Sequence, residues 1–334
     1  MAENPLLALP NVESDRVRIE EELRASVTAP TAALTEMASH LIGAGGKRVR
    51  PLFAIASAAC LAGHDGGPAS IEAIRGGVSV ELVHLGSLYH DDVIDEAVTR
   101  RGVESVNSRW GNLRAILSGD FLLAKASEIA ASLGTEVAGL LAATIGRLCE
   151  GEVLELQDAY QVDRTEEAYL ASIEGKTASL LSSACRIGAI VGDLPREEID
   201  QLTRFGTAYG MAFQVVDDIL DVIATDEQLG KPAGHDLVEG AYNLPVLRAL
   251  AGPSGEELRS LLGTPIDGET WARARTIVRE SDAIEQSVDV ARAYVDQAGD
   301  VLAPFGDRPA AVALRGASEH LLGSLETVRA SARG

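Results

Sequence analysis

Aromatic side chains and cysteines are scarce in this chain of 334 residues, and both shortages limit what the protein can be. Aromatics make up 4% of the sequence, while hydrophobic residues make up 46%. The core must therefore consist mainly of Ala, Leu, Val and Ile, a composition that favours helices. The three cysteines, an odd number at widely separated positions, indicate neither a disulfide framework nor a zinc site, and we expect Cys60, Cys149 and Cys185 to be buried thiols.

Basic residues are also few, because 29 Lys and Arg face 50 Asp and Glu, for a formal net charge of −21. A field of this sign repels nucleic-acid backbones and anionic lipid surfaces. We therefore expect no nucleic-acid partner, and any anionic substrate must be met by a local cluster of cations.

Long apolar runs are missing as well. No stretch supplies the roughly 18 consecutive uncharged apolar residues that a membrane span requires, and the run at 178–191 is interrupted by Arg186. Residues 1–12 lack the basic and apolar regions of a signal peptide and are expected to form a tail. We expect a cytoplasmic protein and leave open a peripheral contact with a membrane.

Helical periodicity begins near Asp15 and continues almost without interruption, broken only by clusters of Gly, Pro and Asp. No segment predicts a strand, and no linker divides the chain, so residues 13–334 are expected to form one all-α domain. The predicted helices span about 15–27, 31–43, 50–62, 70–97, 112–132, 136–159, 165–191, 196–225, 243–250, 255–263, 269–280, 283–302 and 309–331.

What the chain does contain is a duplicated acidic pattern. Asp91-Asp92-Val93-Ile94-Asp95 and Asp217-Asp218-Ile219-Leu220-Asp221 each end an apolar helical run. Residues four apart share a helix face, so the first and last aspartates of each copy form a pair of carboxylates. Carboxylate oxygens favour Mg²⁺ or Ca²⁺, and Mg²⁺ commonly completes its shell with substrate phosphate. The two copies predict a diphosphate held between two metal-binding helix ends.

Two clusters of cations accompany this pattern. Lys47, Arg48 and Arg50 lie beside glycines at the start of a predicted helix, and Arg100 and Arg101 follow the first acidic copy. Guanidinium groups suit bidentate phosphate binding, and helix N-termini favour anions. The first cluster predicts a second diphosphate site that uses side-chain cations instead of metal, with Arg48 as the member expected to be structural.

Together these residues resemble the trans-isoprenyl diphosphate synthases, or polyprenyl synthetases, over about residues 30–328. The matching elements, all in the family's order and spacing, are Gly-Gly-Lys47-Arg-Val-Arg50-Pro, His84 seven residues before the first acidic copy, Arg100-Arg101-Gly, Gly-Asp120-Phe, Glu-Gly-Lys176-Thr177, Gln214 before the second copy, and Gly-Lys231-Pro. The resemblance implies an isoprenoid-synthase-type helical bundle around a central cavity, and a homodimer.

The resemblance also implies a reaction and a role for each matching residue. An allylic diphosphate ionises, the double bond of isopentenyl diphosphate attacks the cation, and a proton is lost to the released diphosphate. By resemblance, Asp91, Asp95 and Asp217 hold three Mg²⁺ ions on the allylic diphosphate, with Asp92 and Asp221 assisting and Asp218 in the same metal-binding set. Arg100, Lys176, Thr177, Gln214 and Lys231 would surround that substrate, with Lys176, Thr177 and Gln214 at the reacting centre, and Lys47, Arg50, His84 and Arg101 would hold isopentenyl diphosphate.

Product length is predicted from the residues before the first acidic copy, where bulky side chains in the family stop the growing chain. Here these positions are the small Gly86 and Ser87, with Val83 deeper in the helix. We expect a linear all-trans product of about C35–C50, a class taken from the resemblance, and keep a C20–C30 product as the alternative. The release of so long a product would involve transient contact with a membrane.

Three positions depart from the family pattern, namely Glu155, Ala241 and Asn243, and they bear on turnover more than on fold. Two rival functions also remain open, a class I terpene synthase and a non-catalytic partner subunit of a heteromeric synthase. A terpene synthase needs no isopentenyl site, and its second metal motif typically contains Asn or Ser. A partner subunit would be expected to have lost one or both acidic copies. Both acidic copies and the Lys47–Arg50 cluster are intact here, which favours the synthase.

Overall fold

The computed structural model describes residues 4–229 and 233–332, and it confirms the all-α fold class. The helices in this part of the chain are η1 (Pro5–Ala8), α1 (Val12–Ser26), α2 (Ala32–Gly43), α3 (Val49–Ala58), α4 (Ile71–Ile94), α5 (Val106–Trp110), α6 (Asn112–Ser132), α7 (Thr135–Gln157), α8 (Glu166–Ile173), η2 (Glu174–Ala178), α9 (Ser179–Val191), α10 (Arg196–Ile223), α11 (Asp226–Leu229), α12 (His235–Glu239), α13 (Leu244–Leu250), α14 (Gly255–Leu261), α15 (Gly268–Glu280), α16 (Ala283–Val301), η3 (Ala303–Phe305) and α17 (Pro309–Ala332).

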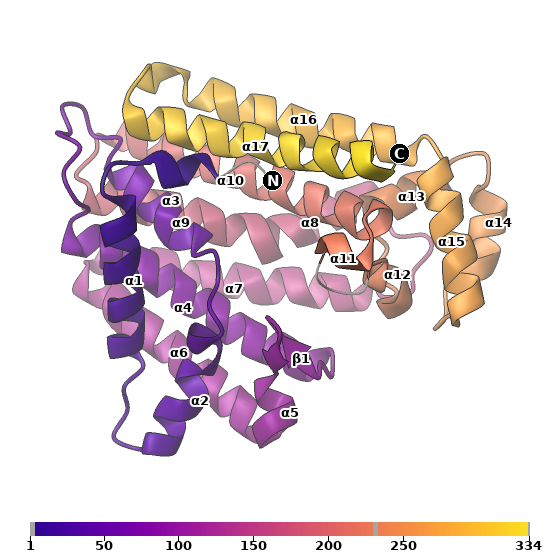
Figure 1. Cartoon of the computed structure of the whole chain (residues 1–334), viewed down its shortest axis with the longest axis horizontal. Coiled ribbons are helices and arrows are strands. Elements are labelled where there is room, and N and C mark those ends of the chain that lie inside the picture. Colours follow the sequence, from indigo (N-terminus) through magenta and orange to yellow (C-terminus); the bar gives the residue numbers. More distant parts are fainter. Residues whose placement is uncertain (1–3, 230–232, 333–334) are drawn as a thin grey trace.

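Two long helices, α4 and α10, form the centre of the bundle. Helix α4 packs against α3, α6 and α9, whereas α10 packs against α9, α16 and α17. Helices α16 and α17 run side by side along one edge of the molecule, and α14 and α15 close one end (Figure 1). Each acidic copy lies in the last turns of one central helix, so the arrangement of α4 and α10 determines where the carboxylates lie.

Small residues allow the helices around α4 to approach closely. A side chain at Gly188 of α9 would overlap the carbonyl oxygen of Ala54 in α3, and one at Gly77 of α4 would lie 2.7 Å from the Cα atom of Pro51. Contacts this short tolerate no added methyl group without a backbone shift. The start of α3, which carries Arg50, is thereby fixed against α4.

The structure differs from the sequence prediction in several places, including the short helices α5, α11 and α12, which none of the predicted helices covers. The helix expected over 165–191 is interrupted by a π-helical turn, η2, and a short antiparallel pair, β1 (Thr99–Arg100) and β2 (Val103–Glu104), occurs where no strand was predicted. Residues 5–8 form a 3-10 helix and Leu6 is fully buried, because Asn4 caps this helix and Pro5 suits its first turn. Cys149 is exposed, so the prediction of a buried thiol was wrong at that position, whereas Cys60 and Cys185 are buried.

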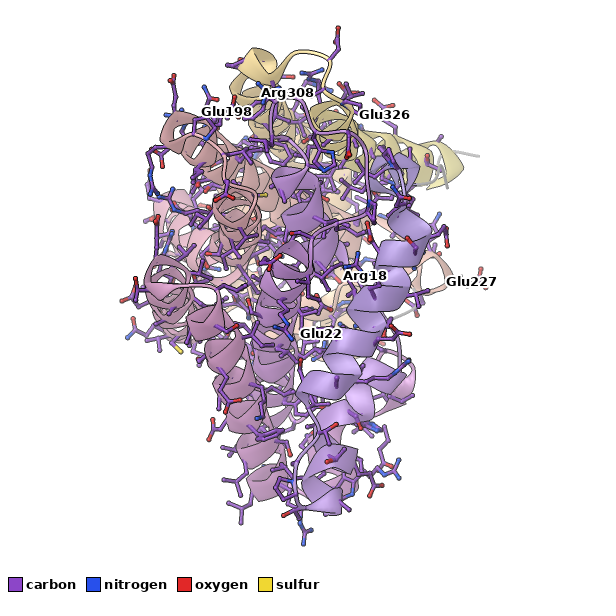
Figure 2. The ribbon with its side chains drawn as sticks, turned by 90° about the vertical axis from the view of Figure 1, so that its left-hand side faces the viewer. Arg18, Glu22, Glu198, Glu227, Arg308 and Glu326 are labelled. Carbon is purple, nitrogen blue, oxygen red and sulfur yellow. The ribbon has the colours of Figure 1, made fainter. Side chains whose placement is uncertain are left out.

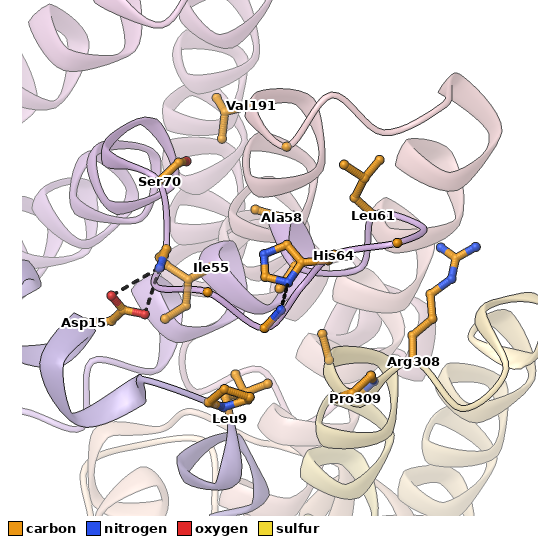
Figure 3. A pocket seen from close by; sticks show the side chains of 18 of the residues that line it. Leu9, Asp15, Ile55, Ala58, Leu61, His64, Ser70, Val191, Arg308 and Pro309 are labelled. Atoms are coloured by element: carbon orange, nitrogen blue, oxygen red, sulfur yellow. Dashed lines mark hydrogen bonds between the residues drawn. The ribbon is translucent and has the colours of Figure 1, made fainter.

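A cavity of about 460 Å³ lies at the end of the bundle where α4 begins, and Leu9, Ile55 and Val191 are among its apolar lining residues (Figure 3). Two of its charged groups are paired within the protein. Asp15 accepts a hydrogen bond from the amide of Ala69 at 3.1 Å, and Arg308 donates to both carboxylate oxygens of Glu198 at 3.1 and 3.0 Å (Figure 2). This cavity is therefore poorly suited to hold a diphosphate.

None of the described helices combines the length and the apolar character that crossing a membrane requires.

Candidate active site

The first acidic copy occupies the C-terminal end of α4, where Asp95 is the capping residue and its amide donates to the carbonyl of Asp91 at 2.8 Å. Burial raises the pKa of Asp91 to about 7; Lys176 opposes this shift, and the carboxylates of Glu152 and Asp95 add to it. The negative end of the helix dipole disfavours the carboxylates further. This end of α4 therefore favours a cation.

The second aspartate of each copy points into the protein. Asp92 is fully buried, and its Oδ1 accepts from Nε of Arg100 at 2.6 Å, while its Oδ2 has no hydrogen-bond partner among the described residues. Both oxygens of Asp218 are engaged, since Tyr169 donates to Oδ2 at 2.5 Å and Gln214 donates to Oδ1 at 2.8 Å. The two carboxylates, equivalent in sequence, thus differ in what they can still bind.

The π-helical turn Glu174–Ala178 places Lys176 between two glutamates of α7. Its Nζ lies 2.7 Å from a carboxylate oxygen of Glu152 and 3.2 Å from one of Glu155. These carboxylates raise the pKa of Lys176, although its burial alone would lower it. The close approach depends on glycine, because a side chain at Gly151 would lie 2.5 Å from the amide nitrogen of Lys176.

The next residue of the turn contacts the other central helix. The hydroxyl of Thr177 donates to Oε1 of Gln214 at 2.8 Å. A π-helical turn is wider than an α-helical one and is frequent at functional sites. Here it connects α7 on one side with α10 on the other.

These elements enclose a cavity of about 200 Å³. Asp95 of the first copy and Asp218 of the second both line it, so the structure brings the two copies to one site. The other lining residues include Lys176, Thr177 and Gln214, which the sequence predicted, together with Glu155, Arg164, Tyr169, Ser172, Ile173, Asp236, Glu239, Ala241 and Asn243. Glu155, Ala241 and Asn243, the three departures from the family pattern, thus all face this cavity.

A second cluster, of cations, surrounds His84 on α4. Burial, together with the charges of Arg50, Arg101 and Arg100, holds the pKa of His84 well below its usual value. Burial and the charge of Arg101 also lower the pKa of Arg50, against the opposing carboxylate of Glu81. The structure therefore brings together Arg50, His84 and Arg101, and it leaves the neighbouring Lys47 exposed.

Arg48 has a structural role and does not contribute an unpaired charge to this cluster. Its guanidinium lies 2.6 Å from Glu20 and 3.2 Å from Glu81, and the residue is buried. A left-handed backbone at Arg48 and at Arg101 helps both side chains meet beside Gly46. This matches the structural role expected for Arg48 from the sequence.

The residues predicted to control product length occupy different environments. Val83 is fully buried, and a side chain at Gly86 would lie 3.1 Å from the carbonyl oxygen of Gly119 and 3.2 Å from Leu123 on α6. Ser87 is half-buried and its hydroxyl donates to the carbonyl of His84 at 2.9 Å. Gly86 thus serves close packing of α4 on α6, and of the three positions Ser87 has the most open surroundings.

Three residues of this site carry no sequence signal of their own, namely Glu152, Arg164 and Tyr169. Glu152 and Tyr169 contact partners that are distant in sequence, and Arg164 lies in the loop before α8, so no spacing within a helix indicates their partners. Lys231, which the sequence placed beside the allylic diphosphate, lies outside the described residues.

No three His, Cys, Asp or Glu side chains in the described ranges are close enough together to ligate one metal ion. The site nevertheless fits a hard cation, because it holds crowded carboxylates, a raised pKa at Asp91, and a buried Asp92 oxygen for which the described part of the chain supplies no partner. Mg²⁺ typically takes one or two carboxylates and completes its shell with water and substrate phosphate. The donors present would hold metal together with a phosphate ligand.

Comparison with known proteins agrees with this geometry. The polyprenyl synthetase family model matches residues 31–278. The chain is 39% identical to heptaprenyl diphosphate synthase component 2 of Geobacillus stearothermophilus, over 86% of this chain and 88% of the relative. It is 37% identical to nonaprenyl diphosphate synthase of Mycobacterium tuberculosis, over 91% and 90%. Among solved structures, a polyprenyl synthase from Caulobacter crescentus, complexed with calcium and isoprenyl diphosphate, superimposes with a TM-score of 0.88 at 31% identity, covering 96% of this chain and 99% of that one.

Proposed function

The chain belongs to the polyprenyl synthetase family, and from this premise we propose that its cavity joins isopentenyl diphosphate to an allylic diphosphate, repeatedly, to make a long linear all-trans polyprenyl diphosphate. It is a prenyltransferase. The observation that carries the proposal is that both acidic copies line one cavity together with Lys176. The cluster of guanidinium groups surrounds His84 on the same helix as the first copy. The names of the relatives support a product in the C35–C50 range.

We assign the metal to Asp91, Asp95 and Asp217, with Asp92 and Asp221 assisting. Three Mg²⁺ ions, each sharing the allylic diphosphate, would supply positive charge where the departing diphosphate accumulates negative charge. Calcium in the Caulobacter crescentus structure is consistent with a divalent cation in this family.

The side chains of the protein perform the remaining steps. Lys176 and Arg100 would bind the allylic diphosphate, and both now contact carboxylates that the phosphate oxygens must replace. Lys231 is proposed for the same diphosphate from the sequence alone. Oε1 of Gln214 and the hydroxyl of Thr177 would direct oxygen dipoles at the allylic cation.

Lys47, Arg50, His84 and Arg101 would hold isopentenyl diphosphate. The lowered pKa of His84 keeps its imidazole neutral near pH 7, so it can donate a hydrogen bond without adding to the repulsion among the arginines. Because fixed cations would hold both diphosphates, the double bond of isopentenyl diphosphate would be positioned to attack the allylic carbon of the other substrate.

The purified protein is expected to convert farnesyl or geranylgeranyl diphosphate and radiolabelled isopentenyl diphosphate into labelled polyprenyl diphosphates of about C35–C50 when Mg²⁺ is present. Product length is read by reversed-phase chromatography after phosphatase treatment, and EDTA should stop the reaction. Cyclic hydrocarbon from the allylic substrate alone would indicate a terpene synthase instead. Absence of elongated product with every allylic primer would refute the proposal.

A second copy of the chain is proposed to cover the outer face of α6 and α7. These two helices expose Leu113, Leu117, Val153 and Leu156, each at least half exposed. The Geobacillus stearothermophilus relative is named as one component of a synthase, so a different partner chain is the competing arrangement. Sedimentation of the purified chain should give the mass of two copies; a single-chain mass together with inactivity would favour the heteromer.

A further inference from the structure

Tyr169, on α8, is a buried side chain of the cavity that none of the sequence motifs includes. It is 2% exposed, and its hydroxyl donates to Oδ2 of Asp218 on α10 at 2.5 Å. The guanidinium of Arg164 lies over its ring at 5.6 Å from the centroid, and the same guanidinium donates to Ser172 at 2.6 Å. The tyrosine is therefore held from two sides, and its hydroxyl has one fixed partner.

Both carboxylate oxygens of Asp218 already accept a hydrogen bond. Tyr169 occupies Oδ2, the amide nitrogen of Gln214 occupies Oδ1 at 2.8 Å, and the residue is 5% exposed. A metal ion at this carboxylate would have to share an oxygen that a hydrogen bond already holds in place, in a nearly buried environment, which disfavours coordination. Asp92 differs, because one of its buried oxygens has no partner among the described residues.

The same contacts decide which way the side-chain amide of Gln214 faces. The amide nitrogen of Gln214 donates to Oδ1 of Asp218, and a carboxylate in its ionised form can pair only with this NH₂ end of the amide. The carbonyl oxygen must then point the other way, where it accepts from the hydroxyl of Thr177 at 2.8 Å at the cavity wall. A reversed amide would present N–H groups, and thus positive charge, to an allylic cation.

We propose that Tyr169 and Asp218 are positioning residues that fix the carbonyl oxygen of Gln214 toward the reacting allylic group, and that Asp218 is not a metal ligand. The inference rests on the proposed prenyl transfer and deepens it. It takes Asp218 out of the metal-binding set predicted from the sequence, while the other aspartates keep their proposed roles.

Tyr169→Phe is the first test, since it removes one hydroxyl and keeps the ring. Loss of a hydrogen bond to a charged group is expected to lower kcat about 10- to 100-fold, because the orientation of the Gln214 carbonyl oxygen matters only when the allylic cation forms. The KM for each diphosphate and the Mg²⁺ concentration at half-maximal rate should stay within twofold of wild type. Tyr242→Phe is the matched control, because it removes another buried hydroxyl, which accepts from the amide of Gly263 at 2.7 Å, and it should retain wild-type kcat.

Asp218→Asn tests the metal assignment without turnover. Calorimetric titration with farnesyl thiodiphosphate, a poorly reactive analogue, in the presence of Mg²⁺ should give an affinity within threefold of wild type for Asp218→Asn, whereas Asp217→Asn should bind at least tenfold more weakly. The kcat of Asp218→Asn should fall as it does in Tyr169→Phe, because asparagine can pair with either orientation of the Gln214 amide.

Two outcomes would overturn the inference: a wild-type kcat in a folded Tyr169→Phe variant, or an affinity of Asp218→Asn as weak as that of Asp217→Asn. The fold of each variant is checked by urea unfolding, and the titration remains decisive where a variant has no activity. Failure of the wild-type protein to elongate any primer would instead count against the proposed function, so the two failures are distinguishable.

Discussion

Asp91→Asn is expected to lower kcat roughly 1,000-fold, because it removes a charge that would hold the metal on the departing diphosphate, an effect worth several kcal/mol. The substitution keeps the size of the side chain. It should also leave the metal-free protein at least as stable as wild type, since burial raises the pKa of Asp91 to about 7 and charging that carboxyl is unfavourable in the fold. A drop in activity without a drop in stability separates a functional carboxylate from a structural one.

The measurement pairs steady-state turnover with thermal unfolding. Wild type should gain stability when Mg²⁺ and inorganic diphosphate are added together, because a ligand that binds only the folded state stabilises it, and Asp91→Asn should gain much less. Asp300→Asn, at an exposed position of α16, is the matched control and should behave as wild type in both respects. Turnover within tenfold of wild type in Asp91→Asn would remove the metal assignment of this aspartate.

The parts of this site that the sequence predicted are those determined by local geometry. Asp91 and Asp95 share a helix face because they are four residues apart, and the helix that carries them is a long, mainly apolar run. The helix at 112–132 was predicted with the bounds that the structure shows, since Gly111 and Gly134 flank it. The family resemblance added the roles, and comparison with known proteins confirms the family while the roles of individual residues stay predictions.

The parts that the sequence could not predict depend on contacts between distant residues. Tyr169 and Asp218 are 49 positions apart, and an isolated tyrosine in a helix gives no sign that its hydroxyl meets a carboxylate. The close approach of Gly175 to Gly151 of α7 allows the π-helical turn and brings Glu152 to Lys176. Tertiary packing, not local propensity, decides such features.

Arg50→Met is expected to raise the KM for isopentenyl diphosphate about 10- to 100-fold, while the KM for the allylic diphosphate changes less than threefold. Arg50 is in the first turn of α3, its Nε is buried without a hydrogen-bond partner among the described residues, and the positive end of the helix dipole adds to the repulsion. Binding of a diphosphate would supply the missing partners. Loss of this guanidinium should therefore affect one substrate more than the other.

The same variant should unfold at a higher temperature than wild type when no ligand is present. Burial and the nearby charge of Arg101 lower the pKa of Arg50, and a base whose pKa is lower in the folded state destabilises the fold wherever it remains charged. Arg196→Met, which removes an exposed guanidinium paired with Glu136, should change neither KM. A lower unfolding temperature in Arg50→Met, with an unchanged KM for isopentenyl diphosphate, would mean that Arg50 serves the fold. A higher unfolding temperature together with a raised KM for isopentenyl diphosphate would mean that the protein maintains an unfavourable cluster of charges because its substrate neutralises them.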